Sequence, residues 1–174
     1  MKRFISLVLC CLILSSCSAK KESLFDYQKG ELSFDCTLVY NGHENEVKIT
    51  MSAPNDKGER ETVIVEYSSP EIIGGYTLEK SGGQYKGKMG DMEIPFGEKA
   101  AGVVKALERV FSLSEDMISG IDTAENGMSE ANFVCEDITG KVIINENGEI
   151  SAIEAGFSDG DSVSISIKNQ GADG

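Results

Sequence analysis

Apolar and polar residues alternate along much of the chain after residue 31, and this period-two pattern restricts the fold more than any other feature. It runs through residues 34–40, 47–51, 63–67 and 163–167. A strand with this pattern buries one face and exposes the other, as strands of an antiparallel sheet do. Turn signals lie between such strands, at Asn41-Gly42, Asn147-Gly148 and Asp159-Gly160. The pattern therefore predicts several antiparallel strands.

One segment, residues 98–111, follows a helical period instead. Its apolar residues recur at three- and four-residue spacing: Ala100, Val103, Val104, Leu107, Val110 and Phe111. This spacing predicts an amphipathic helix of about four turns. Gly102 weakens that helix by about 1 kcal/mol relative to alanine. We expect Leu107 and Phe111 to face the sheet, where they are candidates for ligand or partner binding.

The strands and the helix together predict a curled sheet. About five strands precede the helical insertion and about four follow it. Ser114, with acids directly behind it, predicts a short second helix that runs to Gly120. A long antiparallel sheet must curl, and its concave face needs cover. The predicted fold class is α+β, mainly β: a curled antiparallel sheet with one or two lid helices on its concave face.

The N-terminus has the features of a lipoprotein leader. A basic start, Lys2-Arg3, precedes the uncharged run 4–14, which is about 17 Å long as a helix and too short to cross a bilayer. The sequence Leu14-Ser15-Ser16-Cys17 resembles a bacterial lipobox, which implies that Cys17 carries acyl chains of the palmitate class. The alternative is an ordinary signal peptide in which Cys17 is incidental. The expected division is a leader at 1–16, a lipidated tether at 17–30 and a domain at 31–170.

Charge and cysteine content restrict the partners. The formal net charge is −13, and it becomes −15 without the leader, which contains Lys2 and Arg3 but no acid. Such an acidic chain is a poor partner for nucleic acid.

Three cysteines remain after processing: Cys17, Cys36 and Cys135. Cys36 and Cys135 are either a candidate disulfide of an exported domain or two small buried residues.

The order of elements resembles the LolA/LolB-like half-barrel of bacterial lipoprotein carriers, and also the GerS-like germination lipoproteins. The similar segments are "YSSPEIIGGYTLEKSGG" (67–83), "GEKAAGVVKALERVFSLSEDM" (97–117) and "GKVIINENGEISAIEAGFSDGDSVSISIKN" (140–169). The resemblance implies a domain that binds an apolar chain in its concave face, or a protein partner. Arg60 and Arg109 are the two arginines outside the leader, and neither lies in a motif that identifies the carriers' lid-latching arginine.

The sequence contains little that indicates catalysis. His43 is the single histidine and is expected in an exposed turn, so neither a nucleophile–histidine pair nor a zinc cluster is indicated. The acids at 145–149 and 158–162 do not match a calcium loop and fit hairpin turns. One alternative stays open: two carboxylates, distant in the sequence, that come together in the folded chain as in a glycoside hydrolase. No cofactor or metal is expected.

One predicted connection has an apolar centre. Ile72 and Ile73 lie between Pro70 and Gly74. Two branched apolar residues on a loop either bind a partner or plug one end of the half-barrel.

These observations predict an exported lipoprotein that Cys17 anchors to the membrane outside the cytoplasm. Its domain is expected to bind an apolar ligand, such as a lipid, or a protein of the cell envelope, without being an enzyme. Two alternatives stay open: an activator of a cell-wall enzyme, and an envelope hydrolase with paired carboxylates. An apolar lining favours binding, whereas two facing acids in a polar groove favour the hydrolase.

Overall fold

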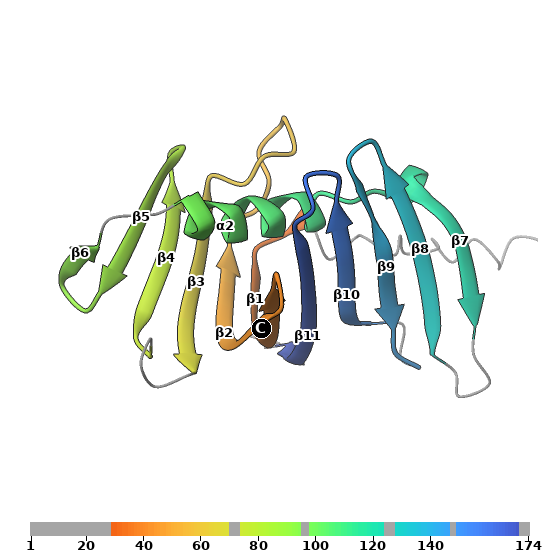
Figure 1. The fold of residues 1–174 in the computed structure, drawn as a ribbon. Helices are drawn as coiled ribbons and strands as arrows, with labels where there is room; N and C mark the ends of the chain where they lie inside the picture. Colours follow the sequence, from red (N-terminus) through yellow and green to blue (C-terminus); the bar gives the residue numbers. More distant parts are fainter. Residues whose placement is uncertain (1–28, 70–73, 95–97, 124–127, 147–148, 171–174) are drawn as a thin grey trace, which may run out of the picture.

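The computed structural model describes residues 29–69, 74–94, 98–123, 128–146 and 149–170. Within these residues, six strands precede a single α-helix and five follow it (Figure 1). The elements are β1 (Leu32–Tyr40), β2 (His43–Met51), β3 (Thr62–Ser69), β4 (Tyr76–Ser81), β5 (Gln84–Met89), β6 (Met92–Ile94), α2 (Glu98–Val110), the 3-10 turn η3 (Glu115–Met117), β7 (Ile118–Thr123), β8 (Ser129–Cys135), β9 (Ile138–Ile144), β10 (Ile150–Phe157) and β11 (Ser162–Gln170).

All eleven strands form one antiparallel sheet in the order β6-β5-β4-β3-β2-β1-β11-β10-β9-β8-β7. The first and last strands pair at its centre, where Leu38 lies opposite Ile165. The two-residue turn Asn41-Gly42 joins β1 to β2, and both residues have positive φ, 50° and 79°. That geometry matches the right-handed twist of the flanking strands, which is why Asn-Gly is favoured there.

The core lies on the concave face, between the sheet and α2. One row of paired residues crosses four strands and is buried throughout: Leu78, Val65, Ile49 and Phe34. Their neighbours along each strand face the other side, as the alternation predicts. Helix α2 lies across this face and contacts β3, β4 and β11 (Figure 1). The predicted mainly β fold, a curled antiparallel sheet with a helix on its concave face, is therefore confirmed.

The predicted second lid helix is wrong for the described residues. The backbone N–H of Met117 donates to the carbonyl oxygen of Ser114, which closes only a single 3-10 turn. The chain from Ile118 then pairs with β8 instead of continuing as helix. Gly120 and the β-branched Ile118, Ile121 and Thr123 fit that strand better than a helix.

The sequence prediction also placed fewer strands on each side of the helix than the structure contains. His43 begins β2, opposite Tyr40, and is exposed.

Among the described helices, none is long and apolar enough to span a membrane.

Candidate functional site

The apolar stripe of α2 is part of the core. Leu107 is 0% exposed and Phe111, just beyond the helix, is 3% exposed. The ring of Phe111 lies against that of Phe34 on β1, with the centroids 5.5 Å apart. Both candidate binding residues therefore lie between the helix and the sheet, where a ligand would replace contacts that now stabilise the fold.

One side wall of the curled sheet binds α2 through Lys80 on β4. The Nζ atom of Lys80 forms an ion pair with Glu108 of the helix and donates to the carbonyl oxygen of Arg60 at 3.3 Å. Glu108 is one residue beyond Leu107, so this ion pair lies at the border of the apolar stripe. The contact fixes the C-terminal half of α2 to the strand on this side.

Arg60 lies beside that wall and is the one buried charged residue in the described part of the chain. Its guanidinium donates to the carbonyl oxygen of Gly30 at 3.1 Å and to that of Ser52. These contacts hold the start of the domain against the loop that joins β2 to β3. Hydrogen bonds to a charged donor stabilise a fold more than neutral ones do.

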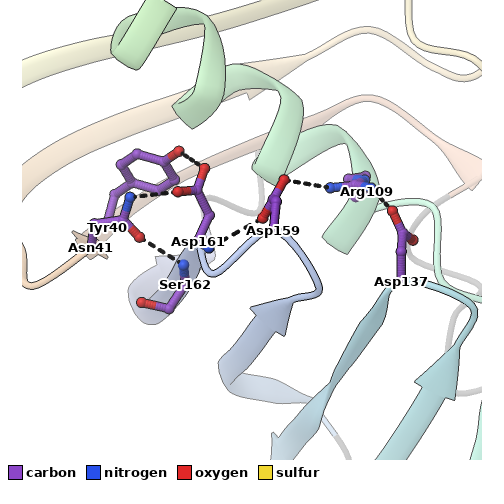
Figure 2. A network of polar contacts seen from close by, with 7 residues as sticks. All are labelled: Tyr40, Asn41, Arg109, Asp137, Asp159, Asp161 and Ser162. Carbon is purple, nitrogen blue, oxygen red and sulfur yellow. Dashed lines mark hydrogen bonds and ion pairs between the residues drawn. The ribbon is translucent and has the colours of Figure 1, made fainter.

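The opposite wall binds α2 through Arg109 (Figure 2). Its guanidinium forms an ion pair with Asp137 in the turn between β8 and β9, and a second nitrogen lies 4.0 Å from a carboxylate oxygen of Asp159. The same guanidinium lies over the ring of Phe157, 4.9 Å from its centroid. Since Glu108 and Arg109 are adjacent, two neighbouring residues of α2 bind the two walls of the sheet.

A second polar contact joins this wall to β1 (Figure 2). The Tyr40 hydroxyl donates to Asp161, and the Asn41 side chain donates to the other carboxylate oxygen at 2.8 Å. The Asn41 side-chain oxygen accepts the backbone N–H of Ser162 at 2.7 Å. These hydrogen bonds lock the turn between β10 and β11 against the turn between β1 and β2, beneath α2.

The pKa values of Asp161 and Tyr40 shift in opposite directions. The bonds from Tyr40 and Asn41 hold the pKa of Asp161 below its ordinary value. This stabilisation is present above the unfolded-state value of 3.8 and is lost as the pH falls through the lower folded-state pKa. Partial burial, and then the bond to Asp161, raise the pKa of Tyr40 from 10.0 to about 12. That contribution is complete below pH 10 and is lost as the pH rises towards 12.

Gly102 lies inside α2, and its lack of a side chain leaves room for the hydroxyl of Tyr40 on β1. A Cβ atom at this position would overlap the Tyr40 hydroxyl oxygen. Gly102→Ala should therefore gain about 1 kcal/mol of helix propensity but lose the hydrogen bond from Tyr40 to Asp161 and the packing of the Tyr40 ring, because Tyr40 must move. We expect a net loss in the free energy of unfolding, measured by urea denaturation.

The matched control for Gly102→Ala is the same change in Tyr40→Phe. The phenylalanine lacks the hydroxyl oxygen, so the alanine should now stabilise the chain. A stabilising Gly102→Ala in the wild-type chain would contradict the assigned role of Tyr40.

A groove of about 620 Å³ lies over the C-terminal half of α2. Arg60 and Lys80 line one side, Asp159 lines the other, and Lys105 and Phe111 lie on the helical side. The groove therefore opens between the two walls that hold α2. Charged side chains line most of it, and Phe111, which is 3% exposed, is the one large apolar residue in its lining. A second groove, of about 560 Å³, involves strands β1 and β8–β11 and contains none of the predicted site residues.

Other predicted residues are not brought together. Cys36 and Cys135 are free thiols, and β11, β10 and β9 separate their strands in the sheet. The candidate disulfide is therefore absent, and burial raises the pKa of Cys36 to about 12, as expected of an inert core thiol. Cys17, Ile72 and Ile73 lie outside the described residues.

Hydrogen bonds favour the ionised form of two acids in the described segments. Hydrogen bonds hold the pKa values of Glu46 and Asp161 below the ordinary values. A general acid for glycoside cleavage needs the opposite shift. Within the same segments, no cluster of three potential metal ligands from His, Cys, Asp and Glu is found.

The sequence predictions missed the contacts that hold the helix. Arg109 lies on α2, Asp137 lies in the turn between β8 and β9, and Asp159 and Asp161 lie in the turn between β10 and β11. No local spacing reveals that these three segments meet. Gly102 is the one local signal, because a glycine inside an amphipathic helix indicates that another group approaches closely.

No protein-family model and no curated protein matches this chain. Among solved structures, the chain is similar to a LolA superfamily protein from Nitrosomonas europaea. The TM-score is 0.37 and the sequence identity is 8%, over 81% of this chain and 85% of that one.

Proposed function

We propose that this chain is an exported, non-enzymatic lipoprotein whose half-barrel binds an apolar group where α2 covers the sheet. The observation that carries the proposal is the way α2 is held. Polar contacts on both walls hold its C-terminal half, and the groove between them reaches Phe111. Partly exposed ion pairs contribute only about 0–1 kcal/mol each, so water can replace them at little cost.

The apolar stripe of α2 makes ligand entry selective. Moving the stripe away from the sheet exposes side chains such as Leu107, and each costs about 1.5–3 kcal/mol to transfer to water. An apolar chain that fills the vacated space offsets this cost, whereas a polar solute does not. The proposed ligand is therefore a molecule with an acyl chain or a similar apolar part.

The test uses Arg109→Gln, which keeps most of the side-chain stem and removes the charge that pairs with Asp137 and Asp159. The full-length protein is mixed with a fluorescent fatty acid, and the rate of uptake is measured. We expect uptake about fivefold faster than in the wild type, since loss of about 1 kcal/mol of closing contacts favours opening by that factor.

The matched control for Arg109→Gln is Lys86→Gln. This change also removes an ion pair, to Glu93 at 3.4 Å, but lies on β5 away from the groove. Its uptake rate should equal that of the wild type. Failure of both the wild type and Arg109→Gln to take up the fatty acid would reject the ligand-binding proposal.

The membrane anchor forms the second part of the proposal. The lipobox-like Leu14-Ser15-Ser16-Cys17 supports acylation of Cys17 outside the cytoplasm. Two or three acyl chains give stable anchoring, which one chain alone does not. The hydrogen bond from Arg60 to Gly30 fixes the point where the tether meets the domain, beside the groove.

Cys17→Ala should prevent acylation and move the protein from the membrane fraction to the soluble fraction, or leave the leader uncleaved. Fractionation of cells followed by mass determination measures both outcomes. Cys36→Ala serves as the matched control, because that thiol is buried in the domain, and this variant should stay in the membrane fraction. A cleaved Cys17→Ala protein that remains in the membrane would overturn the anchor.

A further inference from the structure

The two edges of the sheet differ in how well they are protected. The edge strand β6 has three residues, whereas β7 at the other edge has six. Proteins protect open edges with short strands, lysine, proline or bulges. Strand β7 contains neither lysine nor proline, and its single irregularity lies between Ile118 and Gly120. It is the less protected of the two edges.

Strand β7 is held firmly in place by its inner neighbour. The Ser119 hydroxyl donates to the carbonyl oxygen of Asn132 at 3.1 Å, and Thr123 and Ser129 share a hydroxyl hydrogen bond of 3.1 Å. These contacts pin both ends of β7 to β8. In the described part of the chain, no strand pairs with the outer side of β7, so this side presents backbone hydrogen-bonding groups on a fixed frame.

Exposed apolar side chains lie on both faces of the sheet near this edge, Ile121 on the concave face and Val134 on the other. Ile121 on β7 and Val134 on β8 are each 60% exposed, and Met128, just before β8, is 37% exposed. These are three of the four large apolar side chains that are exposed in the described segments. Ile121 lies opposite the buried Ala131, so it extends the concave apolar face to the last strand.

The charge of the edge is acidic. Asp122 on β7 and Asp116 just before the strand are exposed, and Asp122 lies opposite Glu130. Glu130 forms an ion pair with Lys141 on β9, at 3.6 Å. A second copy of this chain would bring a further acidic β7 against the first, with a net charge of −13 on each chain. Like charges opposite each other destabilise strand pairing, so the edge favours a basic partner over a copy of itself.

We propose that β7 accepts an extended segment of another protein, which adds a twelfth strand and alternates apolar with basic side chains. Backbone hydrogen bonds to the free edge supply the affinity, as in other cases of strand addition. An apolar side chain of the partner covers Ile121, and a lysine or arginine lies near Asp122. This partner site is separate from the groove over α2 and goes beyond the proposed ligand binding.

The test uses a short synthetic peptide of alternating valine and lysine as the probe. The full-length protein is titrated to millimolar peptide, and amide chemical shifts and hydrogen exchange are followed residue by residue. Amides in 118–123 should shift and gain protection, while those of β6 should not. A peptide with the same sequence but methylated on every second backbone nitrogen should lose this effect, because it cannot form the ladder.

The charge of the edge is tested by Asp122→Lys, which should weaken peptide binding about two- to fivefold. Asp91→Lys is the matched control: it makes the same charge change in an exposed turn beside β6 and should leave binding unchanged. The proposal is overturned if the amides of β7 do not respond, if the methylated peptide binds equally well, or if sedimentation shows pairing of two copies through β7. Fatty-acid uptake should be the same in Asp122→Lys and the wild type, so failure at the edge is distinguishable from failure of ligand binding.

Discussion

Leu107→Ala should lower the free energy of unfolding by about 2–5 kcal/mol, the range for truncating a large buried aliphatic side chain. Leu107 is 0% exposed and lies in the stripe with which α2 covers the sheet. Truncation removes apolar contacts and leaves a space that rigid strands on the opposite side cannot fill. Urea denaturation followed by circular dichroism measures the loss.

The control for Leu107→Ala is Val134→Ala on β8, where the side chain is 60% exposed. It should change stability by less than about 0.5 kcal/mol, as most surface substitutions do. If Leu107→Ala costs no more than this control, α2 is not a part of the core, and the proposed closed state of the half-barrel is incorrect.

The sequence predicted the strands and the helix because their signals are local. Phe34, Cys36 and Leu38 alternate with polar residues, and each is buried. A side chain two positions along a strand returns to the same face whatever the partner strand is. The stripe of α2 is equally local, since residues three and four apart share one face of a helix.

Contacts between distant segments could not be predicted in the same way. Tyr40 and Asp161 are 121 positions apart and meet because β1 pairs with β11. The pairing of the first and last strands has no local signature. The same limit applies to the cysteines: both lie in alternating strands, but their distance depends on the order of strands in the sheet.

The second helix was predicted wrongly for a related reason. Ser114 followed by two acids is a good start for a helix, but only a single 3-10 turn forms, at Glu115–Met117. The segment after this turn could either continue as helix or pair with β8, and it pairs with β8. Pairing with β8, as of Ile121 with Ala131, gives the backbone N–H and C=O groups hydrogen-bond partners and places a β-branched residue in a strand. Local propensity does not take the partner strand into account.

Gly140→Ala should prevent folding or lower the free energy of unfolding by several kcal/mol, on the order of the larger effects known for single substitutions. Gly140 lies on β9 between Phe133 of β8 and Ala155 of β10. A Cβ atom there would overlap the carbonyl oxygen of Glu154 and lie 2.7 Å from Phe133 Cζ and 2.9 Å from Ala155 Cα. The backbone atoms belong to a paired strand and cannot move away without breaking the sheet. The Phe133 ring, 1% exposed, has little space to turn.

The matched control for Gly140→Ala is Gly156→Ala on the adjacent strand β10. Gly156 is exposed, and a Cβ atom there would meet nothing within 4 Å. Neither glycine has positive φ, so alanine is compatible with both backbones. Gly156→Ala should be neutral or stabilise by about 0.4–1 kcal/mol, because alanine restricts the unfolded chain.

Thermal unfolding of the two variants therefore separates the close approach at Gly140 from the general effect of replacing glycine in a strand. Equal melting temperatures would show that Phe133 and β10 can move apart, and that the packing between β8, β9 and β10 is looser than the structure indicates.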